Sequence, residues 1–188
     1  MANDEHFGKR DQEEDYFRKQ DRELVERMRK AAAESEALKP LGAESGIQDP
    51  DVLRDIAELG FTADTVILLP LVPILQVAWA EGGISPAERK LILDFARLRG
   101  ITEGSPADQQ LADWLKLQPA PEVFSRGDRL VAAMLAAGAA PTHDLSADDL
   151  VKYCESIAAA SGGILGIGKV SAVERSAIEE IQKALKSR

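Results

Sequence analysis

The stretch "AWAEGGISPAERKLILDFA", residues 78–96, recurs later in the chain in altered form. The second copy is "AAASGGILGIGKVSAVERSAIEEIQ", residues 158–182, and it carries six additional residues, 164–169. Both copies place a Gly-Gly pair before a Ser-x-x-Glu-Arg motif. Ser-x-x-Glu is the capping box that starts a helix, because the two side chains satisfy each other's backbone amides. The duplication predicts two units, each made of an apolar helix, a Gly-Gly turn and a capped helix.

Helix signals also run through the rest of residues 49–188. Asp49-Pro50 and Ser105-Pro106 each place a capping side chain directly before a proline at the first helical position. No alternation of apolar and polar residues is long enough to predict a strand. The prediction is an all-α fold in which 49–188 form one helical domain.

The uncharged segment "TVILLPLVPILQVAWA", residues 65–80, raises the question of a membrane span. A span takes roughly 20 residues, and prolines at 70 and 73 interrupt this helix. We therefore expect a buried core helix that is kinked near its start. The acidic beginning of the chain has neither a secretory nor a transit signal, so the expected location is cytoplasmic.

Residues 1–38 predict a charged helical arm, and 39–48 predict a linker. Acidic residues precede basic ones at i,i+4 spacing along the arm, which stabilises an exposed helix. Its apolar positions form a narrow seam, too thin to join a core but suited to docking on a protein partner. The expected partner-binding residues are Tyr16, Phe17, Leu24 and Met28.

Composition excludes several classes of function. The formal net charge is −9, with 23 Lys and Arg against 32 Asp and Glu, so a nucleic-acid partner is not expected. One cysteine and two histidines leave no thiolate zinc set and no visible nucleophile–base pair. The chain is therefore predicted not to be an enzyme.

The segment "GILGIGK", residues 163–169, contains most of a nucleotide-binding P-loop. A P-loop follows a buried strand, whereas the residues before this segment have a helical apolar period. Val170 also stands where the magnesium-binding hydroxyl belongs. No nucleotide is expected here, and the segment is interpreted as an apolar loop whose contact surface is Ile164, Leu165 and Ile167.

Three glutamates form the candidate metal site. If the two units pack about a pseudo-twofold axis, Glu81 and Glu88 approach Glu174, and such oxygen ligands suit calcium or magnesium. In the alternative interpretation, Glu88 and Glu174 only complete their capping boxes and Glu81 is solvated. Both interpretations stay open at this point, and no cofactor is required.

The duplicated motif resembles the TerB-like family of tellurite-resistance and stress proteins, over roughly residues 51–185. The resemblance implies about seven helices, an acidic metal site near the turns, and a binding or scaffold role in a membrane-associated complex at the inner membrane surface. The family's aspartate before the first glycine is Glu81 in this chain, and the second copy has Ser161 there.

A second resemblance concerns the arm. "FGKRDQEEDYFRKQDRELVERMR", residues 7–29, is similar to the inhibitory segment of the mitochondrial ATP-synthase inhibitor protein. The family's histidine-rich coiled coil does not follow. The sequence thus predicts a non-enzymatic, TerB-like binding or scaffold protein, with inhibition of an ATP synthase through the arm as the alternative.

Overall fold

The computed structural model describes the backbone of residues 4–142, 144–161 and 170–186, and the side chains of residues 18–139, 141–142, 144–160 and 170–186. The described residues hold eight α-helices and no strand, which confirms the all-α prediction for this part of the chain. The chain divides into two compact units, Met1–Lys39 and Pro40–Arg188. We refer to them as the arm and the domain.

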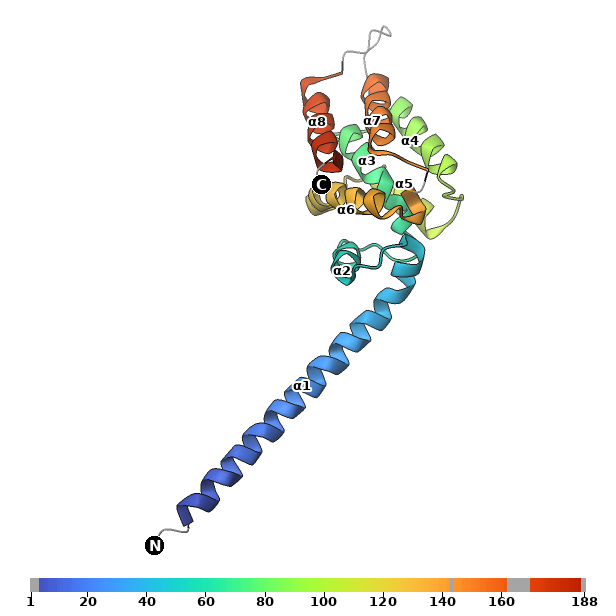
Figure 1. Ribbon diagram of the computed structural model, residues 1–188. Coiled ribbons are helices and arrows are strands. Elements are labelled where there is room, and N and C mark those ends of the chain that lie inside the picture. The colour runs from blue at the N-terminus through green and yellow to red at the C-terminus, as the bar shows by residue number, and fades with distance from the viewer. Residues whose placement is uncertain (1–3, 143, 162–169, 187–188) are drawn as a thin grey trace. The chain divides into compact units, whose positions relative to one another are not determined.

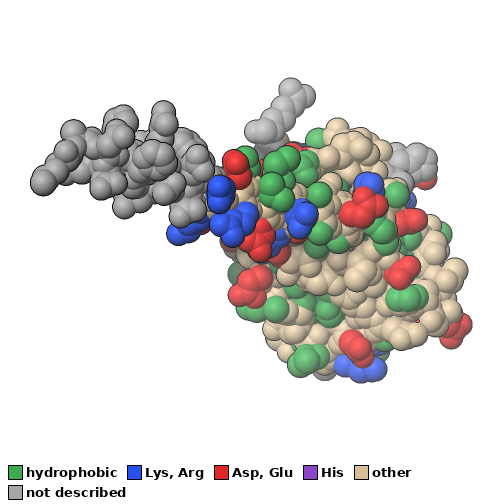
Figure 2. Space-filling model, turned by 90° about the horizontal axis from the view of Figure 1, so that it is seen from below, with side chains coloured by type: hydrophobic (Ala, Val, Ile, Leu, Met, Phe, Trp, Pro, Cys, Tyr) green, Lys and Arg blue, Asp and Glu red, His purple; other side chains and the backbone are tan. Residues whose placement is uncertain are grey.

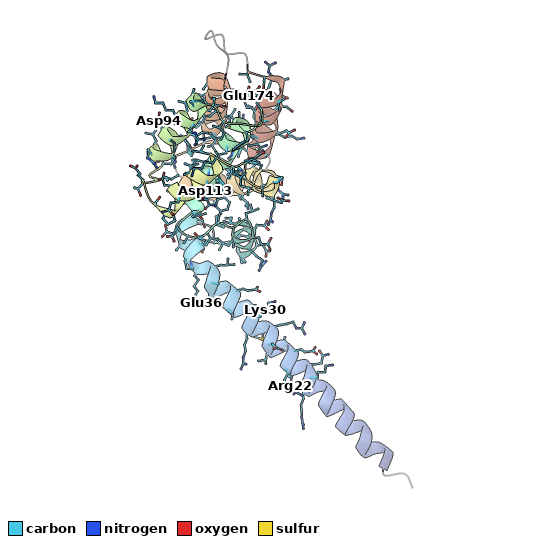
Figure 3. All side chains as sticks on the ribbon, turned by 180° about the vertical axis from the view of Figure 1, so that it is seen from behind. Arg22, Lys30, Glu36, Asp94, Asp113 and Glu174 are labelled. Carbon is cyan, nitrogen blue, oxygen red and sulfur yellow. The ribbon has the colours of Figure 1, made fainter. Side chains whose placement is uncertain are left out.

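The first helix, α1 (Asp4–Ser45), continues beyond residue 38, where the predicted arm ended. Every described side chain from residue 18 to residue 37 is exposed. Arg22 and Arg27 each donate Nε to the carbonyl four residues earlier, at 3.2 and 3.3 Å. Figure 3 shows Arg22, Lys30 and Glu36 projecting outward from this helix. The arm is thus a helix that buries none of these side chains.

The linker interpretation of residues 39–48 is corrected by the structure. Helix α1 continues to Ser45, and irregular chain begins only at Gly46. Leu41, Ser45 and Ile47 are buried in the domain, and a Cβ on Gly42 would lie 3.2 Å from Cδ1 of Leu53. This turn contains Pro40, and proline weakens helices. Tertiary packing therefore keeps the turn helical.

The domain consists of α-helices and two 3-10 helices (Figure 1). In chain order they are α2 (Pro50–Glu58), the 3-10 helix η1 (Val66–Leu71), α3 (Val72–Ala78), α4 (Pro86–Leu98), α5 (Pro106–Trp114), α6 (Pro121–Ala137), the 3-10 helix η2 (Ala140–Thr142), α7 (Ala147–Ser161) and α8 (Ala172–Lys186). The predicted starts at Asp49, Ser85 and Ser105 are confirmed, because each side chain accepts from an amide of the first turn.

Helix α3 occupies the centre of the domain and packs against α4, α6, α7 and α8. The apolar segment that it shares with η1 is buried, with Leu68, Leu69 and Val72 fully inaccessible. This confirms the predicted core helix, and the expected kink is a change from 3-10 to α-helix at Val72. Among the described residues, no helix is long and apolar enough to cross a membrane.

The close approach of α3 to α6 depends on Gly127. A Cβ at this position would lie 2.6 Å from Cγ1 of Val72, which is too close for two carbon atoms that are not bonded to each other. The missing side chain lets the two helices approach closely, and it places the neighbouring Asp128 within the core.

Candidate functional site

The two capping boxes predicted from the duplicated motif are both formed. At the start of α4, the Ser85 amide donates to Glu88 Oε2 at 2.7 Å, and the Glu88 amide donates to Ser85 Oγ at 3.2 Å. At the start of α8, the Ser171 amide donates to Glu174 Oε2 at 2.8 Å, and the Glu174 amide donates to Ser171 Oγ at 3.2 Å. The duplication in sequence is therefore a duplication in local structure.

The glycine turn of the first copy is a left-handed turn. Gly82 has φ +83°, a conformation that favours glycine, and its amide donates to the Trp79 carbonyl at 2.9 Å. The corresponding pair, Gly162 and Gly163, lies outside the described residues.

Within the domain, the two copies of the duplicated motif pack against each other through their apolar helices. Helix α3 contacts α7, and α7 contacts α4 and α8. Glu88 and Glu174 are buried, with 2% and 1% of their surface exposed. Figure 3 shows Glu174 near the start of α8. Burial raises the pKa of Glu88, and the charges of Glu174 and Glu81 raise it further, although hydrogen bonds from Ser85 lower it. Glu81 and Glu174 therefore both lie close enough to Glu88 for their charges to act on it.

The structure does not assemble these glutamates into the expected metal site. Within the described ranges, no three Asp, Glu, His or Cys side chains are grouped to hold an ion. The physical reason is local: each buried carboxylate turns back to its own serine amide, and Glu81 is exposed. The capping interpretation of Glu88 and Glu174 fits this geometry, and the three-ligand interpretation does not.

The first copy of the motif also caps the C-terminal end of α5, a role that sequence analysis did not identify. Trp79 Nε1 donates to the Trp114 carbonyl at 3.0 Å, and Arg89 Nη2 donates to the Leu115 carbonyl at 2.5 Å. Carbonyls at a helix C-terminus have no partner within the helix, and they attract cations. The Glu-Arg of the motif thus serves two helices, since Glu88 caps α4 and Arg89 caps α5.

The predicted docking surface on the arm is exposed where the structure describes it. Leu24, Val25 and Met28 expose 51%, 47% and 63% of their surface, and we call these three residues the apolar stripe. Tyr16 and Phe17 belong to α1, but their side chains lie outside the described ones. Val25 was not among the predicted partner-binding residues, although it is adjacent to Leu24.

The predicted contact loop, with Ile164, Leu165 and Ile167, also lies outside the described residues. The element before it is the helix α7, as the apolar period predicts. A P-loop follows a strand instead, so the structural context of residues 163–169 differs from that of a nucleotide site.

A pocket that sequence analysis did not identify lies where α3, α6 and α8 meet. Its volume is about 750 Å³. The polar residues in its wall are Gln76, Gln118, Ser125, Ser176 and Glu180, and the apolar ones are Trp79, Ala80, Pro119, Ala120, Pro121, Phe124, Val173 and Ala177. Gln76 Oε1 is buried without a hydrogen-bond partner. A buried polar atom of this kind is rare in folded proteins.

Asp128 follows Phe124 and Ser125, two residues of this wall, by one turn of α6. It is 7% exposed, and its Oδ1 is also buried without a hydrogen-bond partner. Burial and, secondarily, the charge of Glu180 raise its pKa to about 7. One signal was present in the sequence, because Asp128 interrupts the buried apolar face of α6, which continues with Val131 and Met134.

Comparison with protein-family models, with curated proteins and with solved structures gave no match. The resemblance to the TerB-like family therefore depends on the duplicated motif in the sequence.

Proposed function

We propose that this chain is a non-enzymatic binding protein of the TerB-like, stress-response type, which engages a protein partner through its helical arm. The observation that carries the proposal is the apolar stripe, which lies on a helix whose described side chains are exposed from residue 18 to residue 37. Isolated helices gain little stability without tertiary packing. A partner helix that covers the stripe would supply that packing.

The charges around the apolar stripe favour a protein partner. Residues 18–30 contain six basic and three acidic residues, so the segment is positive within a chain of net charge −9. A partner helix with acidic residues beside an apolar face would match both features. This is the arrangement of residues that flank the seam of a coiled coil.

Two features of the domain support a binding role rather than catalysis. The seven α-helices from α2 to α8 place the duplicated capping boxes on a packed core, as the TerB-like resemblance implies. The chain's one cysteine, Cys154, is fully buried, and burial raises the pKa of its thiol. A thiol of this kind does not act as a nucleophile.

The proposal is tested by photo-crosslinking in cells. A benzoylphenylalanine placed at Met28 should give a discrete adduct with a protein partner, whereas the same residue at Ala33 should not. Ala33 is exposed on the opposite side of the helix and serves as the matched control. Leu24→Glu in the same chain should abolish the Met28 adduct. Equal labelling from both positions would contradict the proposal.

Two further results would redirect the proposal. An adduct of twice the chain mass would identify a second copy as the partner, and loss of ATP hydrolysis by an ATP synthase on addition of the protein would favour the inhibitor alternative. Deletion of residues 1–38 should shift the melting temperature by less than about 2 °C, because the arm buries none of its described side chains from 18 to 37. A larger fall would show that the arm stabilises the domain.

A further inference from the structure

We propose that the α3/α6/α8 pocket binds the arginine side chain of a partner protein. The acceptors that would receive the guanidinium come from three helices: Gln76 on α3, Asp128 on α6 and Glu180 on α8. This site is separate from the arm, and it concerns a contact that the apolar stripe does not make.

The first argument is the set of unused acceptors. Gln76 Oε1 and Asp128 Oδ1 are both buried without a hydrogen-bond partner, which costs free energy in the free protein. Gln76 lines the pocket directly. Asp128 is one turn beyond Phe124 and Ser125 on the face of α6 that forms the wall. A rotation of each side chain would turn its unused oxygen toward a donor that is bound in the pocket.

The second argument is charge. Glu180 is the one ionisable side chain among the residues that line the pocket, and no Lys or Arg lines it. Two arginines of α6 flank Asp128 in the sequence, but neither lines the pocket. Arg129 is exposed, and Arg126 Nη2 bonds to Asp55 at 2.7 Å and to Glu58 at 2.9 Å. The pocket therefore favours a cation, in a chain whose net charge of −9 steers cations toward it.

The third argument is the shape and chemistry of the wall. The rings of Trp79 and Phe124 line the pocket, and an aromatic face attracts a guanidinium. Arginine presents five donors in a plane and stacks on aromatic rings, whereas lysine presents a compact ammonium. A volume of about 750 Å³ exceeds one side chain, so neighbouring residues of the segment would lie against Pro119, Pro121 and Val173. These features favour a protein segment over a small free amine.

The groups that bear on Asp128 come from the surrounding helices. Glu180 on α8 raises its pKa, and Asp128 in turn raises the pKa of the Cys154 thiol on α7. Helix α3, with the sequence Val-Pro-Ile-Leu-Gln-Val-Ala, carries no ionisable side chain. A bound guanidinium favours the ionised carboxylate, so affinity should increase as the pH rises from 6 to 8.

The experiment titrates the full-length, ¹⁵N-labelled protein with three probes and follows the Trp79 indole N–H signal. The probes are an eight-residue peptide with one central arginine, the same peptide with citrulline in that place, and butylguanidinium alone. Citrulline keeps the shape of arginine without its charge. We expect saturable binding of the arginine peptide, with the citrulline peptide weaker by about tenfold or more.

Variants of α8 provide the matched control. Glu180→Gln should weaken binding of the arginine peptide by about tenfold, whereas Glu179→Gln, an adjacent exposed glutamate outside the pocket wall, should leave it unchanged. Asp128→Asn should abolish the increase of affinity between pH 6 and pH 8. Because Glu180 is exposed, its variant keeps the fold even if the Asp128 variant does not.

Three results would overturn the proposal. The first is no saturable shift of the Trp79 signal at millimolar peptide, and the second is an equal effect of the Glu179 and Glu180 variants. The third is butylguanidinium binding as tightly as the peptide, which would assign the pocket to a small free cation instead of a partner protein.

Discussion

Two regions of the domain bury carboxylates in opposite ways. At the starts of α4 and α8, Glu88 and Glu174 each accept a backbone amide from the serine of a capping box. In α6, Asp128 is equally removed from solvent, but its Oδ1 has no hydrogen-bond partner. On the surface, charged side chains of both signs are interspersed with hydrophobic ones (Figure 2). Glu88, Glu174 and Asp128 differ from these surface charges because they are buried. The comparison separates buried carboxylates that stabilise a helix start from one whose oxygen has no hydrogen-bond partner.

The largest expected difference concerns pH. Asp128 titrates at 3.8 when unfolded and at about 7 when folded, so the folded state binds the additional proton between those values. Stability must therefore fall as the pH rises from about 4 to 7. The fall is at most about 4 kcal/mol, and the raised pKa of Glu88 adds to it in the same direction. Urea unfolding at pH 5 and pH 8 measures the part of this fall that lies above pH 5.

Asp128→Asn should flatten this dependence, since the variant has no proton to lose. The carboxylates whose pKa is lowered, at Asp108, Asp148 and Asp149, change protonation below this pH range and leave the dependence unaffected. An unchanged difference between pH 5 and pH 8 in the variant would show that Asp128 is not the titrating group.

The second prediction tests whether the two capping boxes are equivalent. Ser85→Ala and Ser171→Ala should each lower the free energy of unfolding by about 1 kcal/mol, because each removes one cap from a helix start. Ser156→Ala is the control, since Ser156 is exposed in the middle of α7 and bonds only back to the Lys152 carbonyl. It should change stability by less than about 0.5 kcal/mol. A cost at Ser85 alone would mean that the second box is dispensable.

The smallest expected effect is that of divalent cations. Because Glu88 and Glu174 are engaged in their boxes, millimolar calcium or magnesium should leave the melting temperature unchanged within about 1 °C. Glu88→Gln retains the hydrogen bond of the box without the charge, so it should respond to the ion as the wild type does. A rise in the wild type that this variant lacks would restore the metal hypothesis and make the glutamates ligands.

Features that depend on contacts between residues close together in the chain could be predicted from the sequence, and features that depend on long-range contacts could not. Ser85, Glu88, Ser171 and Glu174 form their bonds within three residues, so the motif alone specified both boxes. The C-terminal end of α1 was predicted too early, at residue 38. The reason is that Leu41 and Ile47 are buried by contacts that the local sequence does not reveal.

The candidate sites divide along the same line. Leu24 and Met28 were recognised from their spacing on one helix. The α3/α6/α8 pocket was not, because the residues that line it, such as Gln76, Phe124 and Glu180, are far apart in the chain and come together only through packing. The duplication led us to expect that Glu81 and Glu88 approach Glu174, but it did not indicate the direction in which the carboxylates of Glu88 and Glu174 turn.

The buried cysteine is a natural probe of how often the core of the domain opens. Cys154 is fully inaccessible in α7, and its thiol has a raised pKa, so alkylating reagents reach it only when the helices around α3 separate. The chain has no second cysteine to compete for the reagent. The rate of thiol modification therefore counts openings of the core in the native protein, without denaturant and without an introduced label.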